Sequence, residues 1–111
     1  YHGKDYKTMF ATSYGGARNV VTLDGVFLAS TGKVLSGIRL TAPKTWVSNW
    51  HHYDTLMTLQ THVQNKINRI LPISIRHESG GDYNQDYYSD IPRVARSFAK
   101  YLPAHQQNQE F

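Results

Sequence analysis

The spacing of apolar residues in the second half of the chain constrains the fold more than any other feature. Large aliphatic side chains recur there at intervals of 3, 4, 4 and 3 residues, which places them on one face of a helix. These residues are Leu56, Leu59, Val63, Ile67 and Ile70. Thr45 or Asp54 is expected to cap the start of this helix, and Pro72 is expected to end it.

A second apolar stripe predicts another helix over residues 91–102. Its members also recur at helical spacing, and they are Ile91, Val94, Phe98 and Leu102. Asp90 is well placed as the N-cap of this helix, with Pro92 in the first turn. The polar tail that follows, residues 103–111, is expected to be frayed.

The chain before Pro43 has a different pattern. Short segments rich in β-branched and apolar residues are separated by glycine-containing turns, and Asp24-Gly25 between two such segments is typical of a type I′ hairpin. Gly37 is expected to mark a bulge in the third strand. The predicted strands lie near 19–23, 26–30 and 34–41, with an edge strand at 6–12 and a short strand at 73–76.

Together these patterns predict a small α+β fold. We expect an antiparallel sheet of three to four strands, covered on one face by two helices. A chain of 111 residues can bury one core without help from disulfides, so residues 1–111 are predicted to form a single domain. A sheet with so few strands is expected to leave an edge exposed, which favours contacts between copies.

The composition excludes several classes of function. The sequence has no Cys, which excludes a disulfide framework and thiolate catalysis. No apolar run approaches the roughly 18 residues that a membrane helix needs, so no membrane span is predicted. A formal net charge of +4 permits contact with phosphate groups or acidic surfaces without requiring it.

Four of the eight acidic residues are concentrated between residues 78 and 90. Within this loop, oxygen-bearing side chains occupy relative positions 1, 3, 5 and 9, a spacing at which they can converge on a calcium ion. They are Asp82, Asn84, Asp86 and Asp90. In the alternative interpretation, Asn84 and Asp86 form local turns and Asp90 caps the following helix. The sequence therefore leaves two options, no cofactor or a bound calcium ion.

The same loop supports a second interpretation. Residues 75–82 read Ile-Arg-His-Glu-Ser-Gly-Gly-Asp. This stretch resembles the Glu-Ser-Gly-Gly box around the catalytic acid of lytic transglycosylases and related lysozyme-like enzymes. The resemblance implies a peptidoglycan-directed, glycosidase-like fragment with Glu78 as the acid. The downstream Gly-Leu-Met-Gln segment of that family is missing from this chain, so we expect a non-catalytic protein.

Basic residues on the last predicted helix favour nucleic acid as another partner. Arg93, Arg96 and Lys100 share one face of that helix, and the aromatic residues of the chain are able to stack on bases. The sequence contains no helix-turn-helix or RNP signature, and the adjoining acidic loop would repel phosphate. Nucleic-acid binding is therefore an alternative function.

Three tyrosines in the acidic loop carry the function that the sequence favours. Tyr83, Tyr87 and Tyr88 offer large amphipathic contact areas with few rotatable bonds. We predict a non-catalytic interaction or assembly module that binds a protein partner or itself through this loop and an exposed sheet edge. The alternative is that the three rings pack against the core of the domain. His51 and His52 are expected to be ordinary surface or half-buried histidines.

Overall fold

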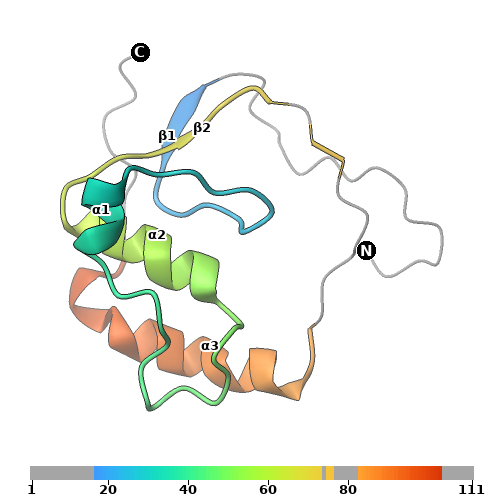
Figure 1. Ribbon diagram of the computed structural model, residues 1–111. Coiled ribbons are helices and arrows are strands. Elements are labelled where there is room, and N and C mark those ends of the chain that lie inside the picture. Colours follow the sequence, from blue (N-terminus) through green and yellow to red (C-terminus); the bar gives the residue numbers. More distant parts are fainter. Residues whose placement is uncertain (1–16, 74, 77–82, 104–111) are drawn as a thin grey trace.

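The computed structural model describes residues 17–73, 75–76 and 83–103 of the chain (Figure 1). These residues form two short strands, three α-helices and a final 3₁₀ turn. In chain order the elements are β1 (Arg18–Val20), α1 (Gly32–Ser36), α2 (Tyr53–Val63), β2 (Asn68–Ile70), α3 (Gln85–Ser97) and η1 (Ala99–Tyr101). The structure is thus a small α+β fold, as the sequence predicted. None of the helices in the described ranges is long and apolar enough to cross a membrane.

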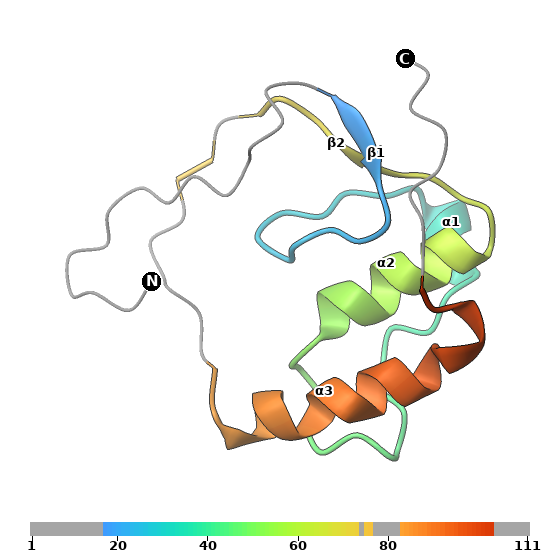
Figure 2. The same cartoon turned by 180° about the vertical axis from the view of Figure 1, so that it is seen from behind.

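Helix α2 lies at the centre of the structure, between the strands and α3. Strands β1 and β2 pair antiparallel on one side of α2, with Asn19 opposite Arg69. Helix α3 lies on the other side and runs in the same direction as α2, as Figures 1 and 2 both show. The N-terminal ends of α2 and α3 therefore lie at the same end of the molecule.

The buried core lies between α2 and α3. Its members are Trp46, Leu56, Leu59, Val94 and Phe98. Leu56 and Leu59 come from α2 and Val94 comes from α3, so both predicted apolar stripes are confirmed in part. The indole N–H of Trp46 donates to Ser97 Oγ at 3.0 Å, which satisfies the polar edge of a buried ring.

The first predicted helix is shorter than its apolar stripe. Helix α2 ends at Val63, and Asn65 then adopts a left-handed backbone conformation with φ 61°. Such a residue commonly ends a helix, because the following backbone can no longer continue the helical hydrogen bonds. Ile67 is consequently 58% exposed and Ile70 belongs to β2.

The start of α2 also differs from the prediction. His52, and neither Thr45 nor Asp54, occupies the N-cap position. Asp54 sits in the first turn, where its carboxylate accepts hydrogen bonds from the backbone N–H groups of Gly25 (3.0 Å) and Thr55 (2.7 Å). A negative charge is favourable at a helix N-terminus, and this one also holds the loop around Gly25 against the helix.

The sheet of the described residues is narrower than the predicted three to four strands. It contains β1 and β2, each three residues long. Residues 26–30 form no strand, and residues 73, 75 and 76 are not in a strand either. The predicted edge strand at 6–12 lies outside the described residues.

Local capping explains why the segment 31–37 is helical and not extended. Thr31 caps α1 by accepting a hydrogen bond from the Val34 N–H at 3.2 Å, and Gly37 ends this helix where a strand bulge was predicted.

The predicted type I′ turn at Asp24-Gly25 does not form, since Asp24 has no positive φ. The backbone N–H of Gly25 instead bonds to α2, so a tertiary contact decides the conformation of this loop.

Helix α3 begins at Gln85, ahead of the predicted start at Ile91. Its N-cap is Asn84, whose side-chain oxygen accepts a hydrogen bond from the Tyr87 N–H at 3.1 Å. The prediction of Asp90 as the N-cap is therefore wrong, because Asp90 lies inside the helix. Residues 104–111 of the predicted tail lie outside the described residues.

Candidate functional site

Six ring-bearing residues gather where α2 and α3 begin, and we call them the aromatic cluster. They are Trp50, His51, His52, Tyr83, Tyr87 and Tyr88. Three come from the segment before α2, and three come from the start of α3 and the residues just before it. Because α2 and α3 run parallel, the three rings before α2 lie next to the three rings at the start of α3 (Figure 1).

A buried carboxylate in α3 positions the segment that carries the first three rings. The side chain of Asp90 is 0% exposed, and its two oxygens accept hydrogen bonds from the backbone N–H groups of Val47 (2.7 Å) and Ser48 (2.9 Å). Ser48 Oγ in turn accepts hydrogen bonds from the backbone N–H groups of Trp50 and His51. Because a buried carboxylate needs such partners, Asp90 and this segment stabilise each other.

His52 holds an unusual backbone conformation at the centre of the cluster. Its φ of 61° lies in the left-handed region, which is uncommon for residues other than glycine. The ring stacks on Tyr87 with centroids 4.3 Å apart, and its Nε2–H donates to the backbone carbonyl of Tyr87 at 2.8 Å. A residue held in such a conformation by its surroundings is often found at a functional site.

His51 forms the buried base of the cluster. Its Nε2 lies 3.0 Å from Asn84 Oδ1, and its ring stacks on Trp50 with centroids 4.3 Å apart. Asn84 Oδ1 also accepts the backbone N–H of Tyr87, and a carbonyl oxygen can only accept. The contact therefore requires a proton on Nε2 of His51. The N-cap of α3 is thus tied to the segment that precedes α2.

The outer rings of the cluster face solvent. Trp50, Tyr83 and Tyr88 are 57%, 46% and 57% exposed, whereas Tyr87 is half-buried beneath them. Tyr83 and Tyr88 both meet Tyr87 edge-on, with centroid distances of 4.9 Å and 5.2 Å. The pKa of Tyr87 is raised, first by burial and then by the neighbouring Tyr83 and by Asp54.

The residues of the predicted calcium site are distributed among other roles. Asn84 caps α3 and contacts His51, and both oxygens of Asp90 accept backbone N–H groups. Asp86 is exposed in the first turn of α3, and Asp82 lies outside the described residues. Within the described ranges, no three His, Asp or Glu side chains are grouped so that they could hold a metal ion. A bound calcium ion stays the alternative to no cofactor, and it would involve Asp82.

The predicted nucleic-acid residues lie in two elements, α3 and η1, and not in one helix. Arg93 donates to the Ser89 carbonyl of its own helix and lies 4.0 Å from Asp90. Arg96 is in the last turn of α3, and Lys100 lies in η1, where its Nζ is 5.8 Å from the centre of the Tyr101 ring. Glu78, the predicted glycosidase acid, lies outside the described residues.

Sequence reasoning missed half of the cluster. The sequence predicted a surface or half-buried His51, whereas His51 precedes α2 and is buried. The available signal was three consecutive ring-bearing residues, Trp50 to His52, immediately before a predicted helix. Comparison of the chain with protein-family models, with curated proteins and with solved structures found no match.

Proposed function

We propose that the chain is a non-catalytic interaction module, and that its aromatic cluster contacts a protein partner or a second copy of the chain. One observation carries the proposal. Trp50, Tyr83 and Tyr88 are each about half exposed, yet they rest on rings that are fixed by hydrogen bonds and stacking. Exposed aromatic rings on a rigid base are typical of binding surfaces.

Rigidity matters because association normally has to order the contact side chains, which costs free energy. The contacts of His51 and His52 fix the inner rings before any partner arrives. Ile91 is also exposed, and it follows Tyr87 and Tyr88 in α3 at spacings of four and three residues, so it lies on the same face of that helix. Exposed apolar residues that gather on one face are common where proteins associate.

Acidic groups near the cluster indicate the charge of the partner. Asp54 and Asp24 both contribute to the raised pKa of Tyr87, so their charges act on the cluster. Asp86 is exposed one residue before Tyr87. Charged residues at the rim of an interface mainly set specificity and the rate of association. These carboxylates favour a partner with an apolar centre surrounded by Lys or Arg.

The sheet edge is a second contact surface in this proposal. Among the described residues each strand has a neighbour on one side, and a strand from a partner added at an edge would extend the sheet toward the three or four strands expected from the sequence. Because β1 and β2 are only three residues long, this edge offers few backbone groups. The aromatic cluster is therefore the main surface.

Two alanine variants test the proposal against a matched control. Trp50→Ala and Tyr88→Ala remove exposed rings from the cluster, whereas Tyr101→Ala removes an exposed tyrosine from η1, which follows the C-terminal end of α3. Sedimentation of the full chain over a range of concentrations measures self-association. Photo-crosslinking from a benzophenone side chain at position 88 or at position 101 measures contact with a protein partner.

We expect association to be lost in the two cluster variants and kept in Tyr101→Ala. For a partner, crosslinks should form from position 88 and not from position 101. A chain that stays monomeric at high concentration and gives equal crosslinking from both positions contradicts the proposal. Equal loss of association in all three variants would place the contact elsewhere.

A further inference from the structure

The charged residues of the described ranges are divided between the two ends of the helix pair. Every described acidic residue lies beside the start of α2 or in the first half of α3, and these residues are Asp24, Asp54, Asp86 and Asp90. Several cations lie where the helices end, since Lys66 follows α2, Arg96 is in the last turn of α3 and Lys100 is in η1. Because α2 and α3 run in the same direction, the two groups of charges lie at opposite ends of the molecule (Figures 1 and 2).

Two of the carboxylates are exposed beside the aromatic cluster. Asp86 lies in the first turn of α3, among the tyrosines of the cluster. Asp24 precedes Gly25, whose N–H donates to Asp54 and whose carbonyl accepts the Tyr53 hydroxyl, so the loop that carries Asp24 is fixed to the start of α2. Neither Asp24 nor Asp86 forms an ion pair with a Lys or Arg of the described ranges. The cluster is therefore bordered by negative charge that no described cation neutralises.

At the opposite end, α2 holds a short segment that carries a cation. The Gln60 side chain pairs with the backbone of Arg39, because its Oε1 accepts the Arg39 N–H and its Nε2 donates to the Arg39 carbonyl, each at 2.7 Å. The Gln64 side chain donates to the Gly37 carbonyl at 2.8 Å. These three bonds fix residues 37–39 to the C-terminal end of α2, although the segment belongs to no helix or strand.

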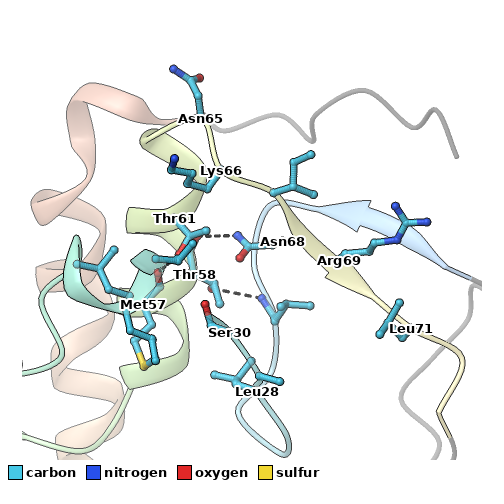
Figure 3. A pocket seen from close by; sticks show the side chains of 16 residues that line it. Leu28, Ser30, Met57, Thr58, Thr61, Asn65, Lys66, Asn68, Arg69 and Leu71 are labelled. Atoms are coloured by element: carbon cyan, nitrogen blue, oxygen red, sulfur yellow. Dashed lines mark hydrogen bonds between the residues drawn. The ribbon is translucent and has the colours of Figure 1, made fainter. Parts of the chain in front are cut away.

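The inward side of α1 and of this segment faces a pocket. The residues of this part of the chain that line the pocket are Val34, Leu35 and Ile38. Figure 3 shows Met57 and Thr61 of α2 at another wall of the same pocket. Three exposed residues with charged or large apolar side chains stay outside the lining, and we call Lys33, Arg39 and Leu40 the basic surface. Neither of its two cations forms an ion pair within the described ranges.

The aromatic cluster and the basic surface are complementary in charge and in apolar character. The cluster offers exposed rings bordered by carboxylates, and the basic surface offers two cations beside a leucine that is 54% exposed. Two aromatic clusters brought face to face would place like charges together, which disfavours a symmetric contact between them. A second copy of the chain therefore fits the cluster best with its basic surface.

We propose that the chain associates head to tail, with the aromatic cluster of one copy on the basic surface of the next. This contact rests on the proposed function, and it names the partner of the cluster as a second copy. Arg39 lies near the carboxylates of Asp24 and Asp86, and Leu40 covers the exposed rings. Because each pair of copies leaves one cluster and one basic surface unused, further copies add until a ring closes or a filament forms.

Two variants at opposite ends of the molecule test the contact. Tyr88→Ala removes an exposed ring from the cluster and leaves the basic surface intact, whereas Arg39→Glu reverses a charge on the basic surface and leaves the cluster intact. Each variant should weaken the dissociation constant of self-association about tenfold or more. Sedimentation of the full chain measures this constant, and it is run at low salt because salt screens exposed charges.

Mixing the two variants separates a head-to-tail contact from a symmetric one. In an equimolar mixture, the basic surface of Tyr88→Ala can meet the cluster of Arg39→Glu, but no further copy can add. The mixture should therefore form a pair of chains, with twice the chain mass of 12.7 kDa, and stop there. If the clusters contacted each other symmetrically, Arg39→Glu would associate by itself as the parent chain does.

A control and a charge exchange complete the experiment. Lys44→Glu makes the same change of net charge as Arg39→Glu at an exposed cation outside the basic surface, and it should associate as the parent chain does. Asp86→Lys should weaken association. Asp86→Lys combined with Arg39→Glu in one chain should associate more tightly than either single variant, because opposite charges again face each other. Circular dichroism of each variant checks that the fold is kept.

Several outcomes overturn the head-to-tail contact and leave the proposed function in place. They are association of Arg39→Glu equal to that of the parent chain, equal weakening in Lys44→Glu, and a mixture that forms no pair. A parent chain that is monomeric at every concentration also overturns this contact, while crosslinking of another protein from position 88 would still support the proposed function. Unchanged association in Tyr88→Ala contradicts the proposed function itself.

Discussion

The buried carboxylate of Asp90 accepts the backbone N–H of Ser48 at 2.9 Å, and this contact joins α3 to a segment 42 positions earlier in the chain. Ser48 also fixes the residues that follow it, because its hydroxyl oxygen accepts hydrogen bonds from the backbone N–H groups of Trp50 and His51. A residue in the middle of one helix thereby sets the position of rings that precede another. The aromatic cluster depends on this contact.

Asp90→Ala is expected to destabilise the fold by about 1 to 3 kcal/mol, since it leaves the backbone N–H groups of Val47 and of the buried Ser48 without an acceptor. Asp86→Ala, an exposed change in the same helix, should cost much less. Urea unfolding of both variants measures the difference in the free energy of unfolding. An equal decrease in the free energy of unfolding in both variants would show that the buried Asp90 contributes no more to stability than the exposed Asp86.

Replacing His52 separates backbone strain from ring contacts. His52→Ala loses the stacking on Tyr87 and keeps a non-glycine residue at φ 61°. His52→Gly loses the same ring but accepts this φ without strain, so it should be more stable than His52→Ala by about 1 to 2 kcal/mol. Thermal or urea unfolding checks the order. A glycine variant that is no more stable than the alanine variant would contradict a strained backbone at this position.

The raised pKa of Tyr87 predicts a loss of stability in alkaline solution. Burial, followed by the nearby Tyr83 and Asp54, raises this pKa above the usual value of 10.0. The folded state therefore holds the phenol proton more tightly, and this contribution to stability is complete below about pH 10 and is lost as the pH rises through the folded pKa. Tyr87→Phe should show a shallower alkaline decline in the free energy of unfolding than the parent chain.

Tyr101→Phe is the control for this titration, because it changes the number of phenols equally and leaves Tyr87 in place. Tyr53 has a pKa raised by burial and then by Asp54 and Asp24, so Tyr53→Phe should also reduce the decline. If the free energy of unfolding falls equally with rising pH in Tyr87→Phe and Tyr101→Phe, the raised pKa of Tyr87 does not contribute to the alkaline loss of stability.

Two glycines give opposite expectations for substitution by alanine. A Cβ atom on Gly25 would lie 2.2 Å from the Tyr53 hydroxyl oxygen, whereas a Cβ atom on Gly32 would meet nothing within 4 Å. Gly25→Ala must displace the outer end of the exposed Tyr53 ring and disturb its hydrogen bond to the Gly25 carbonyl, which should cost about 0.5 to 1.5 kcal/mol. Gly32→Ala lies in α1 and should be neutral or stabilise by up to about 1 kcal/mol. The melting temperatures of the two variants, each compared with that of the parent chain, test whether Gly25→Ala lowers stability and Gly32→Ala does not.

Calcium is expected to leave the melting temperature unchanged. Both oxygens of Asp90 and the side-chain oxygen of Asn84 already accept hydrogen bonds, so a cation would have to displace these contacts. Melting curves across millimolar calcium, with magnesium as the comparison, provide the measurement. A rise that disappears in Asp86→Ala would instead establish a site that includes Asp86.

The helical stripes were predictable because burial in a helix repeats with the pitch of the backbone. Leu56, Leu59, Val94 and Phe98 follow that repeat, and all four are in the core. The ends of the helices were not predictable from the same pattern. Asn65 ends α2 through a left-handed backbone conformation, although the apolar spacing continues through Ile67.

The strands near the N-terminal side were predicted less well, because their conformation depends on distant partners. Gly25 bonds to Asp54 and lies against Tyr53, and these contacts replace the hairpin that Asp24-Gly25 favours locally. The first predicted strand is confirmed in part, as β1, through its pairing with β2. Asn19 in β1 pairs with Arg69 in β2, far along the chain, and pairing between such distant segments leaves no local signal in the sequence.

By itself, the sequence determined the α+β class, the two amphipathic helices and the tyrosine-rich segment, since composition and spacing act over a few neighbouring residues. The tertiary structure decided which rings meet. His52 and Tyr87 are 35 positions apart, and they stack only because α2 and α3 begin at the same end of the molecule. Asp90 looked like a helix cap in the sequence, yet burial turned it into the acceptor that holds Val47 and Ser48, because a charged group without water must bond to whatever donors the fold supplies.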